Sequence, residues 1–183
     1  MALETPEELQ ALQQLLDRSM ATAGAHLRSI AEQTPPARAE VLVALLPRMQ
    51  TIDLATVTAA GEPRVAPVDG HFLKGRWYFG SATNSRRAQH LAARPFASAA
   101  HTRGEGLCVV VHGRVEPVSL RDAGSAWFVE RLRDIYPGYD DWGFEDNPYW
   151  TLHPTHMYAR IPVDAVPEDA LLVDVVPVAA VPE

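Results

Sequence analysis

Residues 70–104 carry six cationic side chains and no carboxylate, although the whole chain has 16 Lys and Arg against 23 Asp and Glu. At the centre of this segment, residues 83–87 read Thr-Asn-Ser-Arg-Arg. We expect a helix to begin here, where free backbone N–H groups and the helix dipole add to the charge of Arg86 and Arg87. The pattern predicts a phosphate site. The alternative is a solvated basic helix without Glu.

Other catalytic chemistries find little support in the residues. The sequence has no Gly-x-Ser-x-Gly motif of a serine hydrolase, and Cys108 lies in an apolar run, where a thiol is normally inert. His153 and His156 are separated by Pro154, which disfavours a helical face that directs both to one metal ion. No glycine-rich dinucleotide fingerprint follows a strand. We therefore expect no metal and no identifiable catalytic residue, with chemistry supplied by a bound cofactor.

Length and composition place the chain among ordinary globular proteins. A chain of 183 residues is long enough for one domain with a substantial core. A single cysteine excludes an internal disulfide and fits a reducing compartment. With no long apolar stretch and no signal-like N-terminus, we expect a cytoplasmic protein without membrane contact. The net charge of −7 argues against nucleic-acid binding.

Residues 1–50 are expected to form a helical segment. Thr5 is followed by Pro6 and Glu8, the pattern of a capping box that opens a helix. Leucines then recur at helical spacing, which predicts a first helix of about 15 to 25 residues. The Pro-Pro pair after Thr34 ends it and starts a second helix, which ends before Pro47.

From residue 52 the hydrophobic period changes to two, which indicates strands. Pro67 cannot donate to a ladder, so the strand that contains it should be an edge or bulged. Between the third and fourth strands Ser85 should cap a short helix that Pro95 closes. Ser119 and Asp122 look like a further capping box. The expected strands are 54–59, 64–73, 76–81, 96–102, 107–118 and 149–161, and the expected helices are 86–93 and 119–135.

These elements predict a mainly β (α+β) antiparallel barrel with flanking helices, because tight turns join antiparallel neighbours. The barrel domain should span residues 51–162, and residues 163–183 should form a loose tail. The aromatic residues 77–79 could stack on a planar ring beside the phosphate site, although alternating aromatics in a strand more often pack in a core. Of the scattered histidines, His101 is the one expected near that site.

The stretch from Leu54 to Val118 resembles the pyridoxamine 5'-phosphate oxidase-like flavoproteins. Matching pieces are Leu-Ala-Thr-Val-Thr-Ala, Gly-Glu-Pro-Arg-Val-Ala-Pro-Val, Trp-Tyr-Phe-Gly-Ser, Ser-Arg-Arg-Ala-Gln-His-Leu and Val-Val-Val-His-Gly-Arg-Val-Glu. Residues 149–154 look like the family's closing strand. The resemblance implies a six-stranded split β-barrel of the FMN-binding type, and a homodimer with a flavin in each cleft between protomers.

The resemblance also implies which residues bind the cofactor. The phosphate would lie against Arg64, Ser85, Arg86 and Arg87. The flavin ring would lie along the backbone of residues 65–67, and Gly80 and Ser81 would line the ribityl chain. Named in full, the candidate cofactor-binding residues are Arg64, Val65, Ala66, Pro67, Gly80, Ser81, Ser85, Arg86 and Arg87.

Three departures separate this chain from the vitamin oxidases that the pattern resembles. Asp69 stands where they have a lysine, Cys108 stands where they have a glutamine facing the ring, and their C-terminal Arg-Leu-x-Pro motif is missing. We therefore expect an FMN-dependent oxidoreductase that acts on a different small substrate. Alternatives are a reductase using an 8-hydroxy-5-deazaflavin coenzyme, whose acidic tail Lys74, Arg76 or Arg94 could meet, and a non-enzymatic flavin, deazaflavin or haem binder. The loop 136–144 would cover the pocket.

Overall fold

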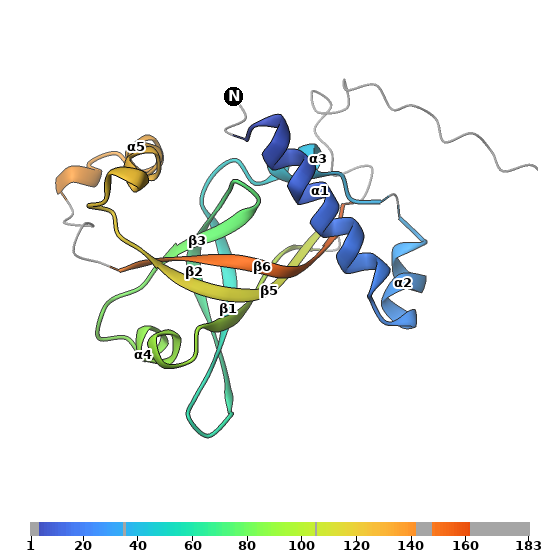
Figure 1. Ribbon diagram of the computed structural model, residues 1–183, viewed down its shortest axis with the longest axis horizontal. Coiled ribbons are helices and arrows are strands. Elements are labelled where there is room, and N and C mark those ends of the chain that lie inside the picture. Colours follow the sequence, from blue (N-terminus) through green and yellow to red (C-terminus); the bar gives the residue numbers. More distant parts are fainter. Residues whose placement is uncertain (1–3, 35, 105, 142–147, 162–183) are drawn as a thin grey trace, which may run out of the picture.

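The fold is a closed antiparallel barrel flanked by helices (Figure 1), described by a computed structural model for residues 4–34, 36–104, 106–141 and 148–161. Within these residues the strands follow the order β1-β2-β3-β6-β5-β4, and β4 returns to pair with β1. The strands are β1 Gln50–Val57, β2 Pro63–Leu73, β3 Arg76–Gly80, β4 Phe96–Arg103, β5 Leu107–Val118 and β6 Tyr149–Arg160. The predicted mainly β, six-stranded barrel is confirmed.

The helices are α1 Pro6–Ala21, α2 Ala25–Ala31, α3 Ala39–Leu45, α4 Arg86–Ala93 and α5 Ala126–Ile135, with 3-10 turns at Ala123–Ser125 and Tyr139–Asp141. The capping box of α1 and the bounds of α4 agree with the sequence prediction. The short α2 was not expected. The prediction that a helix starts at Ser119 is wrong, because the N–H of Asp122 donates to the Ser119 carbonyl in a turn and α5 begins only at Ala126.

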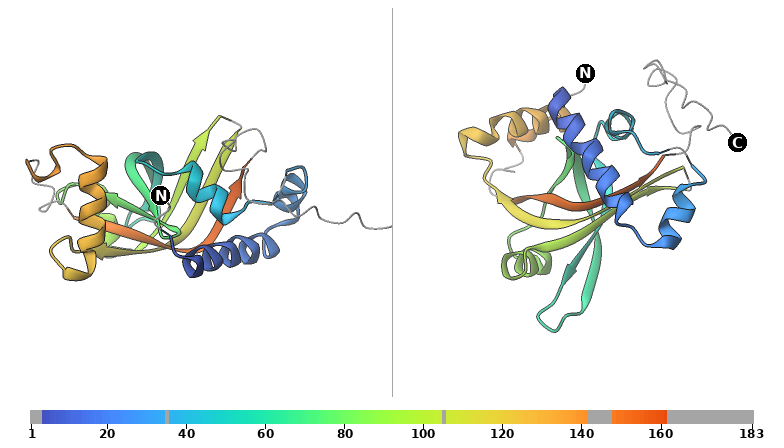
Figure 2. Two further views of the ribbon diagram at one scale, coloured as in Figure 1. Left: turned by 90° about the horizontal axis from the view of Figure 1, so that it is seen from above. Right: turned by 45° about the vertical axis from the view of Figure 1, so that its right-hand side comes forward.

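α1 crosses the barrel over β6, as the two views of Figure 2 show. Its apolar stripe is buried against the sheet, and one hydroxyl joins the two elements. The buried Ser19 Oγ donates to Leu15 O (2.7 Å) and accepts the N–H of Met157 (2.9 Å). The bulge between His112 and Gly113 interrupts the β5–β6 register next to Pro154, which cannot donate. The helical segment therefore packs on the barrel beside a break in the ladder.

Side chains of β3 supply two separate cores. Trp77 and Phe79 are fully buried in the main core of the barrel, whereas Tyr78 belongs to a smaller cluster under α5 with Phe128 and Leu132. This alternation is the period of two expected of a strand covered on both faces. The aromatic residues therefore pack in the two cores, which confirms the core packing that their alternation favoured over a ring-stacking surface.

The β1–β2 hairpin extends beyond the barrel beside α4, at the bottom of Figure 1. β2 pairs with β1 from Pro63 to Gly70, but with β3 only from Gly70 to Leu73. Pro67 thus lies where β2 has a strand on one side only, as its missing N–H predicted. Its carbonyl accepts from Arg87 at 3.2 Å, so it faces α4 and not β1.

His71, buried under α5, should make stability depend on pH. Desolvation, and to a lesser extent the charge of Arg131, lowers the pKa of His71 from 6.5 to about 4. Below pH 6.5 the unfolded chain takes up a proton that the folded chain refuses, so stability falls with falling pH. We expect the free energy of unfolding to drop by about 3 kcal/mol between pH 6.5 and 4 through this residue.

Urea unfolding of wild type and His71→Phe across this pH range measures the effect. Phenylalanine keeps ring contacts with Phe128 and Tyr136, which lie 6.3 and 5.6 Å from the His71 ring. The variant should lose most of the slope. An equal slope in both proteins would show that His71 is protonated freely in the native state.

Candidate functional site

A pocket of about 690 Å³ lies between α4 and the projecting part of the β1–β2 hairpin. Among its lining residues, all within the described part of the chain, are four arginines and no Asp or Glu. Six of the predicted cofactor-binding residues line it. They are Arg64, Val65, Ala66, Ser85, Arg86 and Arg87. The carboxylate-free segment of the sequence thus contributes its helix to an open, cationic hollow.

Ser85 prepares the start of α4 for an anion. It is the N-cap, and its Oγ accepts the N–H of Ala88 at 3.1 Å. Helix geometry gives the N–H groups of Arg86 and Arg87 no acceptor within the helix, because they are the first two of α4. Ser81 Oγ, at the end of β3, lies 2.8 Å from Ser85 Oγ. Hydroxyl and N–H donors therefore gather at one helix end.

Arg87 ties this helix end to the edge of β2. Its Nη2 donates to Pro67 O at 3.2 Å and its Nη1 to Ser81 Oγ at 3.4 Å. Partial burial lowers the pKa of the Arg87 guanidinium, which nevertheless stays charged at neutral pH because an arginine is not deprotonated in proteins. Arg87 thereby brings Pro67 and Ser81 into the site, although neither lines the hollow itself.

Arg64 and Arg86 are more loosely held. Arg64 is exposed and pairs with Glu62 at 2.6 Å near the hairpin turn. Arg86 is also exposed, and its Nη1 lies 3.5 Å from Gln89 Oε1, at the limit of a hydrogen bond. An exposed ion pair contributes little to stability, so an incoming phosphate can compete for Arg64. Both side chains can reorient toward a ligand.

Sequence reasoning did not identify His90 as a site residue, and it named Arg94 only as a possible contact for an acidic tail. His90 Nδ1 lies 3.0 Å from the buried Thr56 Oγ1, and Arg94 Nε donates to Val57 O at 2.9 Å. Both line the pocket. A signal was available, because Arg86, His90 and Arg94 repeat every four residues and therefore share one face of a helix.

Several other residues that were expected at or near the cofactor site do not line this pocket. His101 is buried in β4, with its Nδ1 2.9 Å from Thr51 O, so the prediction that it lies near the phosphate site is wrong. Lys74 and Arg76 line a different hollow against α1. Gly80 packs under Tyr149, whose ring carbon would lie 3.2 Å from an added Cβ. In the loop expected to cover the pocket, residues 142–144 lie outside the described residues, as do residues 163–183 of the tail.

Two positions that differ from the vitamin oxidases, Asp69 and Cys108, do not line the pocket beside α4. Neither do His153 and His156, which were considered as a metal pair. Asp69 is exposed on β2, and Cys108 lines a hollow beside α2. His153 Nε2 lies 3.1 Å from Glu116 Oε2, and its Nδ1 lies 3.1 Å from Arg76 Nη1. Among the described residues, no group of three or more His, Cys, Asp and Glu side chains is placed to hold a metal ion. No helix there has both the length and the apolar character to cross a membrane.

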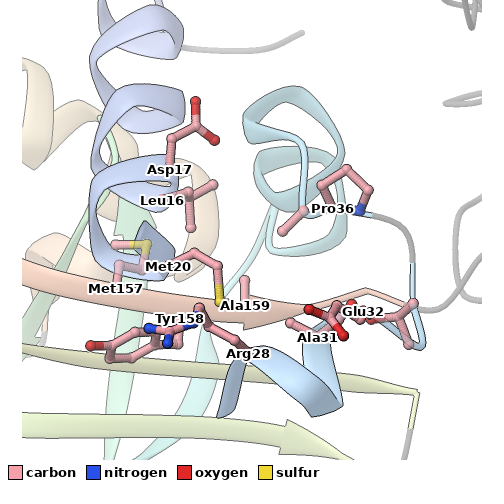
Figure 3. Close-up of a pocket in the computed structure, with 12 residues that line it drawn as sticks. Leu16, Asp17, Met20, Arg28, Ala31, Glu32, Pro36, Met157, Tyr158 and Ala159 are labelled. Carbon is pink, nitrogen blue, oxygen red and sulfur yellow. Dashed lines mark hydrogen bonds between the residues drawn. The ribbon is translucent and has the colours of Figure 1, made fainter. Parts of the chain in front are cut away.

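A second hollow of about 440 Å³ lies between α1, α2 and β6 (Figure 3). Its charged residues are of both signs, Asp17, Arg28 and Glu32. The guanidinium of Arg28 already donates to the carbonyl of Ala23. The remaining lining, including Met20 and Met157, is largely apolar. This hollow is therefore poorly suited to a phosphate, and the pocket beside α4 is the better candidate.

Comparisons with known proteins agree on the fold. The family model described as pyridoxamine 5'-phosphate oxidase matches residues 38–160, about two thirds of the chain. The structure is similar to HutZ, a heme storage protein from Vibrio cholerae (15% identity, TM-score 0.56, 66% of this chain and 91% of that one). It is also similar to an FAD-binding protein from Mesorhizobium loti (18% identity, TM-score 0.54, 67% and 93%). None of the curated proteins searched matches the sequence.

Proposed function

Because the chain belongs to the pyridoxamine 5'-phosphate oxidase family, whose model matches residues 38–160, we propose that it is an FMN-dependent oxidoreductase. FMN would bind in the pocket between α4 and the β1–β2 hairpin. The observation that carries the proposal is the position of Arg87. Its guanidinium joins the N-cap end of α4 to the edge of β2 in a hollow that no described carboxylate lines.

The residues present fit a phosphate. The first N–H groups of α4, the Ser85 hydroxyl and the guanidinium of Arg87 converge at one end of the pocket, and Arg86 is free to swing toward them. Charge-assisted bonds of this kind are the strongest that a protein offers to an anion. Arg64 would complete the proposed set of phosphate-binding groups after its ion pair with Glu62 breaks.

The free edge of β2 fits the polar rim of a flavin ring. In a strand the N–H and C=O of one residue point to the same side, and the side alternates along the chain. Since Pro67 O faces α4, the backbone groups of Val65 face the same edge, whereas those of Ala66 face β1. In this proposal Ser81 would contact the ribityl chain. When bound, FMN would supply hydride transfer, and the protein would supply position and charge.

The substrate is proposed to differ from pyridoxamine phosphate. Asp69 is exposed on the same strand as Val65 and Pro67, two residues beyond the edge that we assign to the ring. A carboxylate there repels a dianionic phosphate, which argues for a neutral or cationic small substrate. A homodimer with FMN between protomers is part of the proposal. The exposed Val65, with 65% of its surface accessible, lies on the pocket wall where a second protomer could cover it.

The experiment is an absorption spectrum of the purified chain, with the mass of any ligand released by heat. FMN, or its uptake at micromolar concentration by the apoprotein, is the expected result. A deazaflavin or haem spectrum would replace FMN with that group. Turnover driven by NAD(P)H identifies an enzyme, whereas tight retention without turnover identifies a binder. A chain that takes up neither a flavin nor a deazaflavin overturns the proposal.

A further inference from the structure

Two exposed histidines face each other across the β5–β6 ladder. His112 and His156 are register partners, so their Cβ atoms lie on the same face of the sheet, about 4.5–5.5 Å apart. The ring contacts agree, because the ring centroid of Tyr158 lies 6.3 Å from that of His112 and 6.5 Å from that of His156. Sequence reasoning compared His156 with its near neighbour His153, whereas the fold pairs it with a residue of β5.

The bulge in this ladder determines which ring nitrogen of His156 carries the hydrogen. Gly113 pairs with Pro154, so Thr155 is the extra residue of β6. The Thr155 hydroxyl donates its one proton to His112 O at 3.0 Å. Toward His156 Nδ1, 3.2 Å away, the same oxygen can only accept, so Nδ1 carries the ring hydrogen. Nε2 of neutral His156 therefore keeps the lone pair that a metal ion needs.

His112 is oriented by a serine on the neighbouring strand. Its Nδ1 lies 2.7 Å from Ser98 Oγ of β4. Metal-binding histidines usually bond their second ring nitrogen to a polar group in this way, which fixes the ring and leaves Nε2 for the ion. Among the described residues, no hydrogen bond or ion pair occupies Nε2 of either His112 or His156.

We propose that His112 and His156 chelate a divalent transition-metal ion through Nε2 of both rings, with water in the remaining positions. Imidazole ligands suit Cu²⁺, Ni²⁺ and Zn²⁺. Two nitrogens bound at about 2.0–2.1 Å to a tetrahedral ion lie roughly 3.3 Å apart, so rings on opposed strand positions need to converge only slightly. Both side chains are exposed, which gives the ion a path in and out. The pair does not line the pocket beside α4, so the site is independent of the proposed function.

The test is isothermal titration calorimetry of the untagged full chain with Zn²⁺, Ni²⁺ and Cu²⁺. One ion should bind per chain, and Cu²⁺ should bind most tightly, as is general for nitrogen ligands. In His112→Gln or His156→Gln the affinity should fall at least about tenfold. The double variant should lose little more than either single one, because each change already breaks the chelate.

Two other histidine variants are the matched controls. His26→Gln removes an exposed histidine of α2, and His153→Gln removes the histidine that contacts Glu116. Both should keep the affinity of wild type. Electron paramagnetic resonance of bound Cu²⁺ should show two nitrogen ligands in wild type, and His156→Gln should lose one of them. Mg²⁺ prefers oxygen ligands and should not displace the bound ion.

A wild-type chain that binds none of the three transition-metal ions overturns the site. So does an affinity that survives either substitution in a folded variant, or one that is lost in His153→Gln but kept in His112→Gln. Uptake of FMN by wild type in the absence of these ions tests the proposed function alone. The metal site and the proposed function can therefore fail separately.

Discussion

Replacement of Arg87 by alanine is expected to weaken FMN binding about tenfold to a hundredfold. Arg87 is the partly buried cation that reaches both Pro67 O and Ser81 Oγ, and no described side chain stands ready to replace its two donors there. Loss of a charge-assisted hydrogen bond costs roughly 1.5 to 3 kcal/mol, which corresponds to this range. Fluorescence quenching of FMN titrated with apoprotein measures it.

Two control variants separate the local effect from general charge. Arg38→Ala removes one cation from an exposed pair with Glu40 and should leave FMN binding unchanged. Arg87→Lys keeps the charge but not the planar donor pair, so its affinity for FMN should lie between those of wild type and Arg87→Ala. Each variant needs a Tm, because Arg87 also links α4 to β2. Wild-type affinity in a folded Arg87→Ala protein would remove the anion site from this position.

Replacement of Gly113 by alanine is expected to lower the free energy of unfolding by about 3 kcal/mol or more. A Cβ at Gly113 would lie 2.0 Å from His153 O and 2.8 Å from the His153 carbonyl carbon. Both are backbone atoms of β6, next to the bulge where the β5–β6 register shifts between His112 and Gly113. The two strands must therefore separate to admit the methyl group. Urea unfolding followed by circular dichroism measures the loss.

The matched control is Gly124→Ala, where an added Cβ meets nothing within 4 Å. Its free energy of unfolding should stay within about 0.5 kcal/mol of wild type. Gly113 does not line the pocket beside α4, so the folded fraction of Gly113→Ala should bind FMN normally. A Gly113→Ala protein as stable as wild type would mean that the β5–β6 bulge relaxes at no cost.

Local signals explain which elements were predictable. Ser85 lies directly before α4 and Pro95 lies two residues after it. The helix runs from Arg86 to Ala93 as predicted. The same logic failed at Ser119, where the pattern of a capping box was satisfied by a backbone turn. Ser and Asp side chains favour turns as well as helix starts, so spacing alone does not separate the two.

The site likewise combines features set by residues close in sequence with contacts between residues far apart in sequence. The charge pattern was sufficient to expect an anion site around Ser85, Arg86 and Arg87, because a helix start and its cations are neighbours in sequence. Thr56 and His90 are 34 positions apart, and only the packing of α4 against β1 brings them within hydrogen-bond distance. His101, close to the segment in sequence, instead lies in the barrel wall.

The sequence by itself determined the strands, the cation-rich helix start and the resemblance to a family, since each depends on period, caps and charge among residues close in the chain. Only the tertiary structure decided that Arg87 bonds to the edge of β2, and that Arg94 lines the pocket whereas Lys74 does not. Those outcomes depend on how far the β1–β2 hairpin projects and on which of its edges stays open beside α4, and both are fixed by the register of the closed barrel.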